Sequence, residues 1–112
     1  MIKQIVKCSS HFAIFDIRLT NNNTLNCDKK YYQKIAFDNY WDQKTAISYI
    51  VVNIDEFTDF MKECFGFGKY RIESYGYFSK PTDMANIPYD KIFTCCIKVE
   101  KTSPSPGVFI KI

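Results

Sequence analysis

The 112-residue sequence lacks several features that would place it at once in a large class of proteins. No apolar run approaches the roughly 18 residues that a membrane-spanning helix needs. Near the start, Lys3 and Lys7 interrupt the apolar residues, so we expect no signal peptide. The chain has only four glycines, and the pair in residues 66–68 follows the best predicted helix, whereas a phosphate-binding loop precedes a helix. We therefore expect neither a membrane protein nor a nucleotide-binding enzyme of the phosphate-loop type.

Histidine and paired cysteines are also too few for a metal site. Cys8 and His11 have the spacing of a ligand pair, but zinc sites usually combine two such pairs. Cys95 and Cys96 do not form the second pair, because adjacent residues of a strand point to opposite faces. The chain has an odd number of cysteines, which are Cys8, Cys27, Cys64, Cys95 and Cys96. This pattern indicates free thiols in a reducing compartment, so we expect a cytoplasmic protein with no metal and no cofactor.

Arginine is scarce as well. Only Arg18 and Arg71 are arginines among the 15 basic residues, and the formal net charge is +3. Because arginine is the main side chain for bidentate recognition of bases and phosphates, a reader of double-stranded nucleic acid is not favoured. The sequence instead abounds in Ile, Lys, Asn, Phe and Tyr, whose codons are AT-rich. This composition indicates an AT-rich genome, such as that of a phage, a mobile element or a low-GC bacterium.

The strongest structural pattern is a strand, a helix and a strand between residues 46 and 78. Residues 46–53 are rich in β-branched and aromatic side chains, which is typical of a strand covered on both faces. Asn53 and Glu56 form an N-terminal cap for a helix over residues 54–65. The buried face of this helix is predicted to consist of Phe57, Phe60, Met61 and Cys64. Phe60→Asp is therefore expected to unfold the domain. Residues 69–78 alternate as a second strand, and the short connections predict that both strands run parallel in one sheet.

Three further strands are predicted outside this unit. Residues 2–7 form a first strand, residues 11–19 a second and residues 91–100 a third. The last two alternate clearly, with inward-facing Ala13, Phe15, Ile17 and Leu19 in one and Phe93, Cys95, Ile97 and Val99 in the other.

Two segments leave alternatives open. Residues 28–40 fit a helix capped by Asp28 slightly better than a strand over residues 31–37. Residues 101–107 form a Pro/Ser-rich linker that leads either to a short C-terminal strand or to a docked tail. We predict one α+β domain over residues 1–112. It has a mixed, mostly antiparallel sheet of about five strands, a helix over residues 54–65 and a possible second helix over residues 28–40.

Aromatic residues are more numerous than one small core needs, at 17% of the chain. Tyr75 and Tyr77 fall on the strand face opposite Ile72, together with Arg71. Tyrosine, tryptophan and arginine dominate binding energies at protein interfaces, because they combine a large contact area with a polar group. The predicted binding residues are Tyr75, Tyr77, Trp41, Arg71, Tyr40, Lys69 and Tyr89. For any single tyrosine, packing within the protein explains its presence as well as binding does.

These residues predict a small non-enzymatic protein that docks on a larger protein or nucleoprotein complex. Together with the composition, they suggest an inhibitor encoded by a phage or mobile element that blocks a host defence system, for example a CRISPR effector. A homodimer is left open.

The alternative is a protein that binds RNA or single-stranded nucleic acid, or a small ribonuclease toxin that uses His11. Residues 74–78 are similar to part of the aromatic strand of RNA-recognition domains, in which exposed rings stack on bases. Glu73, however, stands where a basic residue belongs in that pattern.

Overall fold

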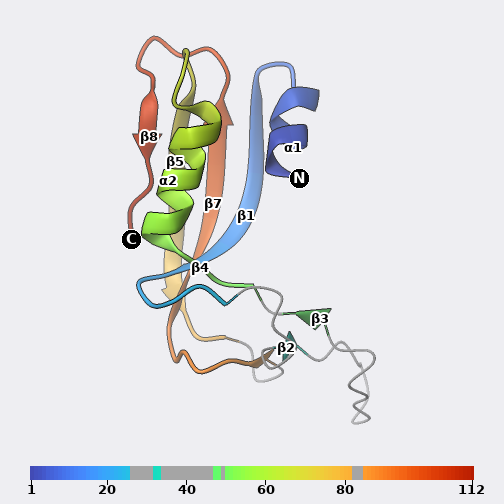
Figure 1. Cartoon of the computed structure of the whole chain (residues 1–112), viewed down its shortest axis with the longest axis vertical. Coiled ribbons are helices and arrows are strands. Elements are labelled where there is room, and N and C mark those ends of the chain that lie inside the picture. The colour runs from blue at the N-terminus through green and yellow to red at the C-terminus, as the bar shows by residue number, and fades with distance from the viewer. Residues whose placement is uncertain (26–31, 34–46, 49, 82–84) are drawn as a thin grey trace.

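The computed structural model describes residues 1–25, 32–33, 47–48, 50–81 and 85–112. It has an α+β fold in which two helices lie on one face of a five-stranded sheet (Figure 1). The helices and strands are α1 (Ile2–Cys8), β1 (Phe12–Thr20), β2 (Tyr32–Gln33), β3 (Ile47–Ser48), β4 (Val52–Asn53), α2 (Ile54–Phe65), β5 (Arg71–Ser79), β6 (Ala85–Asn86), β7 (Ile92–Glu100) and β8 (Gly107–Phe109).

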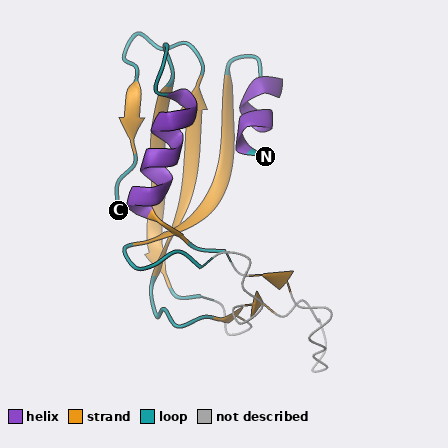
Figure 2. Ribbon diagram, viewed as in Figure 1, coloured by secondary structure: helices purple, strands orange, loops and turns teal. Residues whose placement is uncertain are grey.

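The main sheet is mixed and mostly antiparallel, as the sequence predicted. Its strand order is β4-β1-β7-β5-β8. The three long strands β1, β7 and β5 are antiparallel neighbours, and the short outer strands β4 and β8 run parallel to β1 and β5. A second, three-stranded sheet of order β3-β2-β6 is built from two-residue strands (Figure 2). Strands β4 and β5 lie in one sheet and run in the same direction, as predicted, with β1 and β7 between them.

The alternation predicted for β1 and β7 is confirmed. Ala13 and Leu19 of β1 are buried, and the residues between them alternate between exposed and half-buried. The side chains of Cys95, Ile97 and Val99 on β7 are almost fully buried in the main core. The two strands pair from Phe12–Glu100 to Leu19–Phe93, so this antiparallel pair forms the centre of the fold.

Helix α2 covers this centre and begins where the sequence predicted. The Asn53 side chain accepts hydrogen bonds from the backbone N–H groups of Asp55 (2.9 Å) and Glu56 (3.2 Å), which satisfies two donors that the first turn leaves open. The predicted buried face is confirmed at Phe57 and Met61 and wrong at Phe60, Cys64 is half-buried against the core, and Phe65, which was not predicted, is buried. One residue step turns a helix by about 100°, so a stripe centred on Met61 leaves Phe60 at its margin, and Phe60 is 40% exposed.

The first predicted strand is wrong, because residues 2–7 lie in helix α1. Ile2, Ile5 and Val6 recur at the helical spacing i, i+3, i+4 and pack on the main core. The helix ends where Ser9 donates both its backbone N–H and its hydroxyl to the carbonyl oxygen of Val6. Six residues are too few for the alternation of a strand and the spacing of a helix to be told apart by pattern alone.

The strand predicted over residues 46–53 is divided between two sheets. Its first part is β3 in the small sheet and its last part is β4 in the main sheet. Between them Val51 forms an isolated bridge with Leu25, with backbone hydrogen bonds of 2.8 and 2.9 Å in both directions. Ile50 is 40% exposed, so the expectation of a strand covered on both faces is also wrong there.

The helix predicted over residues 28–40 lies mostly outside the described residues. Within it, Tyr32–Gln33 form β2, which agrees with the strand alternative at these two positions.

The C-terminal segment returns to the sheet as a short edge strand. The linker over residues 101–107 is held by hydrogen bonds from Ser103 N to Lys69 O (2.8 Å) and from Gly107 N to Tyr70 O (2.9 Å). Strand β8 then pairs in parallel with the first three residues of β5. In the part of the chain that the structure describes, neither helix has the length and hydrophobicity needed to cross a bilayer.

Candidate protein-interaction surface

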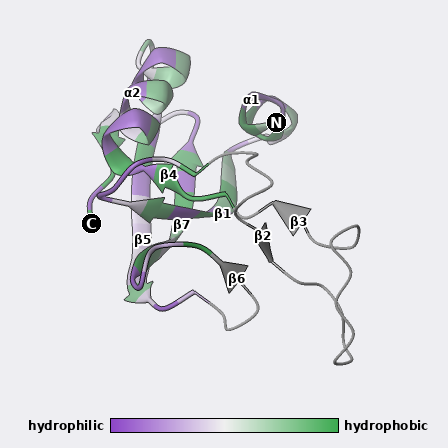
Figure 3. Cartoon of the chain, turned by 60° about the horizontal axis from the view of Figure 1, so that its bottom comes forward, coloured by the Kyte–Doolittle hydropathy of each residue, from purple (hydrophilic) through white to green (hydrophobic). Residues whose placement is uncertain are grey.

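One face of the main sheet has no helix over it among the described residues. Helices α1 and α2 lie together on the same side of the sheet, as Figure 3 shows with the molecule tilted. The outward side chains of β1, β7, β5 and β8 therefore form a surface that we call the open face. Its residues are Phe12, Ile14, Asp16, Arg18, Arg71, Glu73, Tyr75, Tyr77, Thr94, Cys96, Lys98, Glu100 and Phe109.

The open face is ordered in rows, because the register of the three long strands aligns their side chains. Residues directly opposite each other in neighbouring strands have Cβ atoms about 4.5–5.5 Å apart. Read from β1 across β7 to β5, the rows are Phe12-Glu100-Arg71, Ile14-Lys98-Glu73, Asp16-Cys96-Tyr75 and Arg18-Thr94-Tyr77. Phe109 of β8 extends the second row.

Large apolar and aromatic side chains project from this surface. Tyr77 is 64% exposed and Tyr75 is 56% exposed, and on β1 Ile14 and Phe12 are 54% and 51% exposed. Isolated exposed apolar residues are normal on a protein surface, but this one sheet face carries two groups of them, Phe12 with Ile14 on β1 and Tyr75 with Tyr77 on β5, which makes it a candidate binding site. The open face is therefore the strongest candidate for a functional surface among the described residues.

A polar network holds one end of the open face in place. The guanidinium of Arg71 donates to the carboxylate of Glu73 and, through Nη1, to the carbonyl oxygen of Ser105 at 2.8 Å. The same carboxylate accepts a hydrogen bond from the Tyr75 hydroxyl. The Arg71 Cζ atom lies 4.5 Å from the ring centroid of Phe109. Because these side chains are already oriented, less conformational entropy is lost when a partner binds them.

The charges of the open face balance. Its three cations are Arg18, Arg71 and Lys98, and its three anions are Asp16, Glu73 and Glu100. A surface that binds nucleic acid through its backbone needs an excess of positive charge. The open face has no such excess.

The predicted binding residues do not all lie on the open face. Tyr75, Tyr77 and Arg71 do, and Lys69 is exposed in the loop that leads into β5. Tyr89 lies elsewhere: it is half-buried against Val51 and Ile92, and its hydroxyl donates to the carbonyl oxygen of Asn23 at 2.6 Å. Tyr40 and Trp41 lie outside the described residues.

Sequence reasoning missed Phe12, Ile14 and Phe109. The signal for the first two was present, because the alternation that turned Ala13 and Phe15 inward also turned their neighbours outward. For Phe109 no such signal existed, since its face depends on the pairing of β8 with β5.

The four described cysteines are free thiols. Cys8 is exposed, Cys64 and Cys96 are half-buried, and Cys95 is buried. Burial raises the pKa of the Cys95 thiol to about 11, an effect that a hydrogen bond with Ser74 only partly offsets. A thiol with this pKa stays protonated at neutral pH, so Cys95 packs as a small apolar residue.

The raised pKa of Cys95 predicts a pH dependence of stability. Between pH 9.0 and about 11 the unfolded chain releases the thiol proton while the folded chain retains it. The free energy of unfolding should therefore fall as the pH rises through this range, by about 1–2 kcal/mol from this group. Urea unfolding at pH 8, 9, 10 and 11 measures this slope. Cys95→Ala should show a shallower slope, and equal slopes for the two proteins would contradict the assignment.

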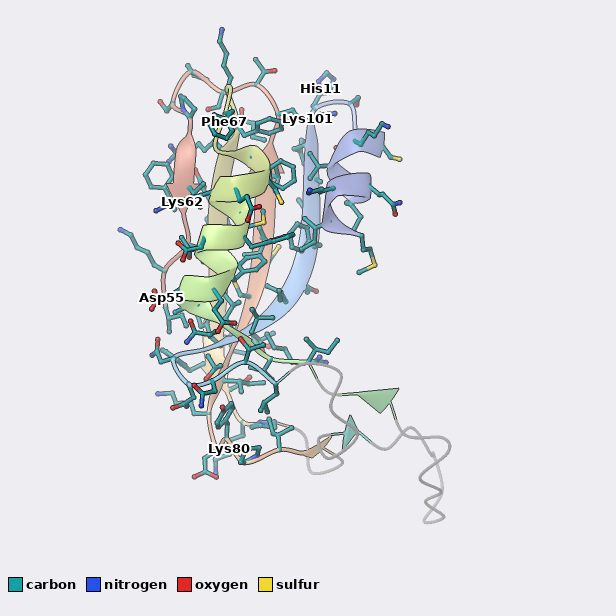
Figure 4. The ribbon with its side chains drawn as sticks, viewed as in Figure 1. His11, Asp55, Lys62, Phe67, Lys80 and Lys101 are labelled. Carbon is teal, nitrogen blue, oxygen red and sulfur yellow. The ribbon has the colours of Figure 1, made fainter. Side chains whose placement is uncertain are left out.

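His11 lies at the end of the molecule where β1 begins and β7 ends, close to Lys101 (Figure 4). A hollow of about 250 Å³ at this end is lined by Ser10, His11, Phe12, Lys98, Glu100, Lys101 and Thr102. The Lys101 ammonium donates to the carbonyl oxygen of Ser9 at 2.7 Å, so it is already anchored. In the described part of the chain no group of three or more His, Cys, Asp or Glu side chains is arranged to hold a metal ion.

No protein family, curated protein or solved structure matches this chain.

Proposed function

We propose that this protein is a non-enzymatic binding protein that docks on a larger protein through the open face. The observation that supports the proposal is the combination of exposed Tyr75, Tyr77 and Phe12 with a balanced set of charges on one sheet face that no described helix covers. Protein interfaces of this kind combine aromatic anchors with polar groups that fix orientation.

Tyr75 and Tyr77 are expected to contribute most of the binding free energy. Burying one large aromatic side chain contributes roughly 1.5–3 kcal/mol, and Tyr75 and Tyr77 stand two residues apart on the same strand face. Phe12 and Ile14 widen the apolar area on β1, while the charged pairs between the two groups set the orientation of the partner. The Arg71–Glu73–Tyr75 network presents this surface in a fixed arrangement.

Charge distinguishes this proposal from binding of single-stranded nucleic acid. Tyr75 and Tyr77 would also serve as a stacking platform for bases. A nucleic-acid platform, however, is accompanied by a positive groove along the phosphate backbone. The open face carries as many anions as cations, and Glu73 and Asp16 would repel phosphates. A protein partner fits these charges better.

The narrower hypothesis concerns the partner. An inhibitor carried by a phage or mobile element would bind a host defence protein, such as a CRISPR effector, and block its substrate site by occupying it. The choice of a host defence protein as the partner depends on the AT-rich composition and on the absence of catalytic motifs, so it remains a prediction from the sequence.

Affinity capture with paired variants tests the proposal. The tagged chain and its Tyr75→Ala/Tyr77→Ala variant are used in parallel to capture proteins from lysates of low-GC bacteria, with quantification by mass spectrometry. We expect at least one large protein or complex to be retained by the wild type and lost with the variant. Equal retention of every captured protein by the two chains would contradict the proposal.

The hollow beside His11 supports a second candidate function, a metal-free ribonuclease. Such an enzyme needs a general base, a general acid and a cation that stabilises the phosphate in the transition state. His11, Glu100 and Lys98 are groups of these kinds, and all three line one hollow.

Cleavage of a fluorescent single-stranded RNA in the presence of EDTA tests the second function. If the chain is a non-enzymatic binder, the wild type and His11→Ala should give the same background rate. Cleavage by the wild type that falls at least 100-fold in His11→Ala, with Tyr75→Ala/Tyr77→Ala unaffected, would support the ribonuclease instead.

A further inference from the structure

The outer edge of β1 carries backbone groups that no described strand pairs over most of its length. His11 lies just before β1 and Lys101 just after β7. The His11 carbonyl oxygen accepts a hydrogen bond from the Lys101 N–H at 2.9 Å, so these two residues form a hydrogen-bonded pair of the antiparallel ladder. In an antiparallel pair such bonded positions alternate, so Ala13, Phe15 and Ile17 also bond to β7. The N–H and C=O groups of the alternate residues Phe12, Ile14 and Asp16 therefore point to the opposite edge.

No strand of the described residues covers that edge between Phe12 and Ile17. Strand β4 pairs with β1 only at Leu19 and Thr20. The chain before β4 turns away, since Val51 bonds to Leu25 rather than continuing along β1. Of the devices that keep an edge strand from pairing, this stretch has no proline, lysine or bulge, and Asp16 is its one charged residue.

Helix α1 extends the helical layer past the edge of the sheet. In both views it lies beyond β1, on the side away from β7 (Figures 1 and 3). Beneath it, Phe15 and Ile17 of β1 remain half-buried, although they belong to the helix-covered face. An additional strand beside β1 would lie below α1 and complete the burial of these two side chains.

We propose that an extended, acidic segment of a partner protein adds to the outer edge of β1 as a further strand. Backbone hydrogen bonds to Phe12, Ile14 and Asp16 would provide affinity, and apolar residues at alternate positions would pack beside Phe15 and Ile17. The acidic character follows from α1, which carries exposed Lys3 and Lys7 and no acidic residue.

A second copy of the chain fits this edge less well. A two-fold pairing of β1 with itself that sets Ile14 opposite Ile14 would place the Asp16 carboxylate opposite the apolar Phe12 of the other copy. It would also place two α1 helices over the same edge, each with Lys3 and Lys7 exposed, so like charges would approach. An acidic segment from another protein avoids both conflicts.

The inference does not depend on the proposed function, because the edge uses backbone groups of β1 rather than the tyrosines of β5. A phage-displayed library of random linear nine-residue peptides is selected on the immobilised full chain, and enriched peptides are synthesised. We expect enriched sequences to alternate apolar residues and to contain Asp or Glu. On the ¹⁵N-labelled chain, a bound peptide should slow hydrogen exchange at the amides of Phe12, Ile14 and Asp16 at least 10-fold.

Variants decide whether the peptides bind the edge. Ile14→Pro removes one outward N–H and should weaken binding at least 10-fold, whereas Ile14→Val keeps the N–H and should bind like the wild type. Lys3→Glu/Lys7→Glu leaves β1 unchanged and should weaken the acidic peptides at least 5-fold, which keeps the test valid if the proline variant fails to fold. The Tyr75→Ala/Tyr77→Ala chain should bind the peptides normally.

Three results would overturn the proposal. The first is that no enriched peptide binds better than its scrambled form. The second is loss of peptide binding in Tyr75→Ala/Tyr77→Ala, which would place the peptides on the open face and leave the proposed function standing. The third is a concentration-dependent dimer in sedimentation, with the same three amides protected without peptide, because the edge would then be occupied by a second copy.

Discussion

Met61→Asp is expected to abolish cooperative folding, whereas Phe60→Asp should leave a folded protein. Met61 is fully buried in the main core, so an aspartate there is an unpaired charge among apolar side chains such as Phe57 and Leu19. Burying an isolated carboxylate costs several kcal/mol or more, which is comparable to the 5–15 kcal/mol total stability of a typical domain. At Phe60, which is 40% exposed, the aspartate stays in water, so the expected loss is about 1–2 kcal/mol.

Thermal unfolding followed by far-ultraviolet circular dichroism separates the two outcomes. Phe60→Asp should show a sigmoidal transition at a temperature lowered by several degrees, and Met61→Asp should show none. The paired variants introduce the same side chain one position apart, so composition and helix propensity are matched. The reverse result, with Phe60→Asp unfolded and Met61→Asp stable, would show that the helix buries the face first predicted from the sequence.

Tyr75→Ala/Tyr77→Ala is expected to reduce affinity for the partner about 100-fold or more. Truncation of an aromatic anchor at the centre of an interface typically costs at least 2 kcal/mol, and each 1.4 kcal/mol is a factor of ten in affinity. Both side chains are more than half exposed in the free protein, so little folding energy should be lost with them. The effect should therefore appear in binding and not in thermal stability.

Titration calorimetry with the captured partner measures this change. Phe67→Ala is the matched control, because Phe67 is 86% exposed but lies in the loop after α2 (Figure 4) and on none of the strands that form the open face. The control should bind like the wild type. If the double variant and the control lose affinity equally, the partner binds by general surface hydrophobicity and the open face is not its site.

Much of the fold was predictable where a segment carries a long, regular pattern. The nine-residue strands β1 and β7 alternate throughout, and α2 combines an N-cap with three turns of apolar spacing, so local signals agree with tertiary packing. Short segments did not carry several local signals that agree with one another. Ile2–Cys8 is one buried stripe of two turns, and the apolar run at residues 50–52 was divided by the bridge from Val51 to Leu25, a contact between distant residues that no local pattern encodes.

The candidate surface was predictable in part for the same reason. The alternation of β5 turned Tyr75 and Tyr77 away from the helices, so their shared face followed from the sequence. Composition alone did not show that Tyr89 packs within the protein. Its hydroxyl donates a hydrogen bond to the carbonyl oxygen of Asn23. That α1 and α2 would both pack on the same face of the sheet could not be predicted, because the side on which a helix packs is a property of the assembled fold.

Hydroxyl-radical footprinting of the free chain and of its complex tests the central claim most directly. Side-chain oxidation of Tyr75, Tyr77 and Phe12 is measured by mass spectrometry, with Phe60 on the helical side as the internal control. We predict strong oxidation of all four residues in the free chain, and protection of the three open-face residues alone in the complex. Unchanged oxidation of Tyr75 and Tyr77 in the complex, or protection of Phe60 instead, would contradict the account.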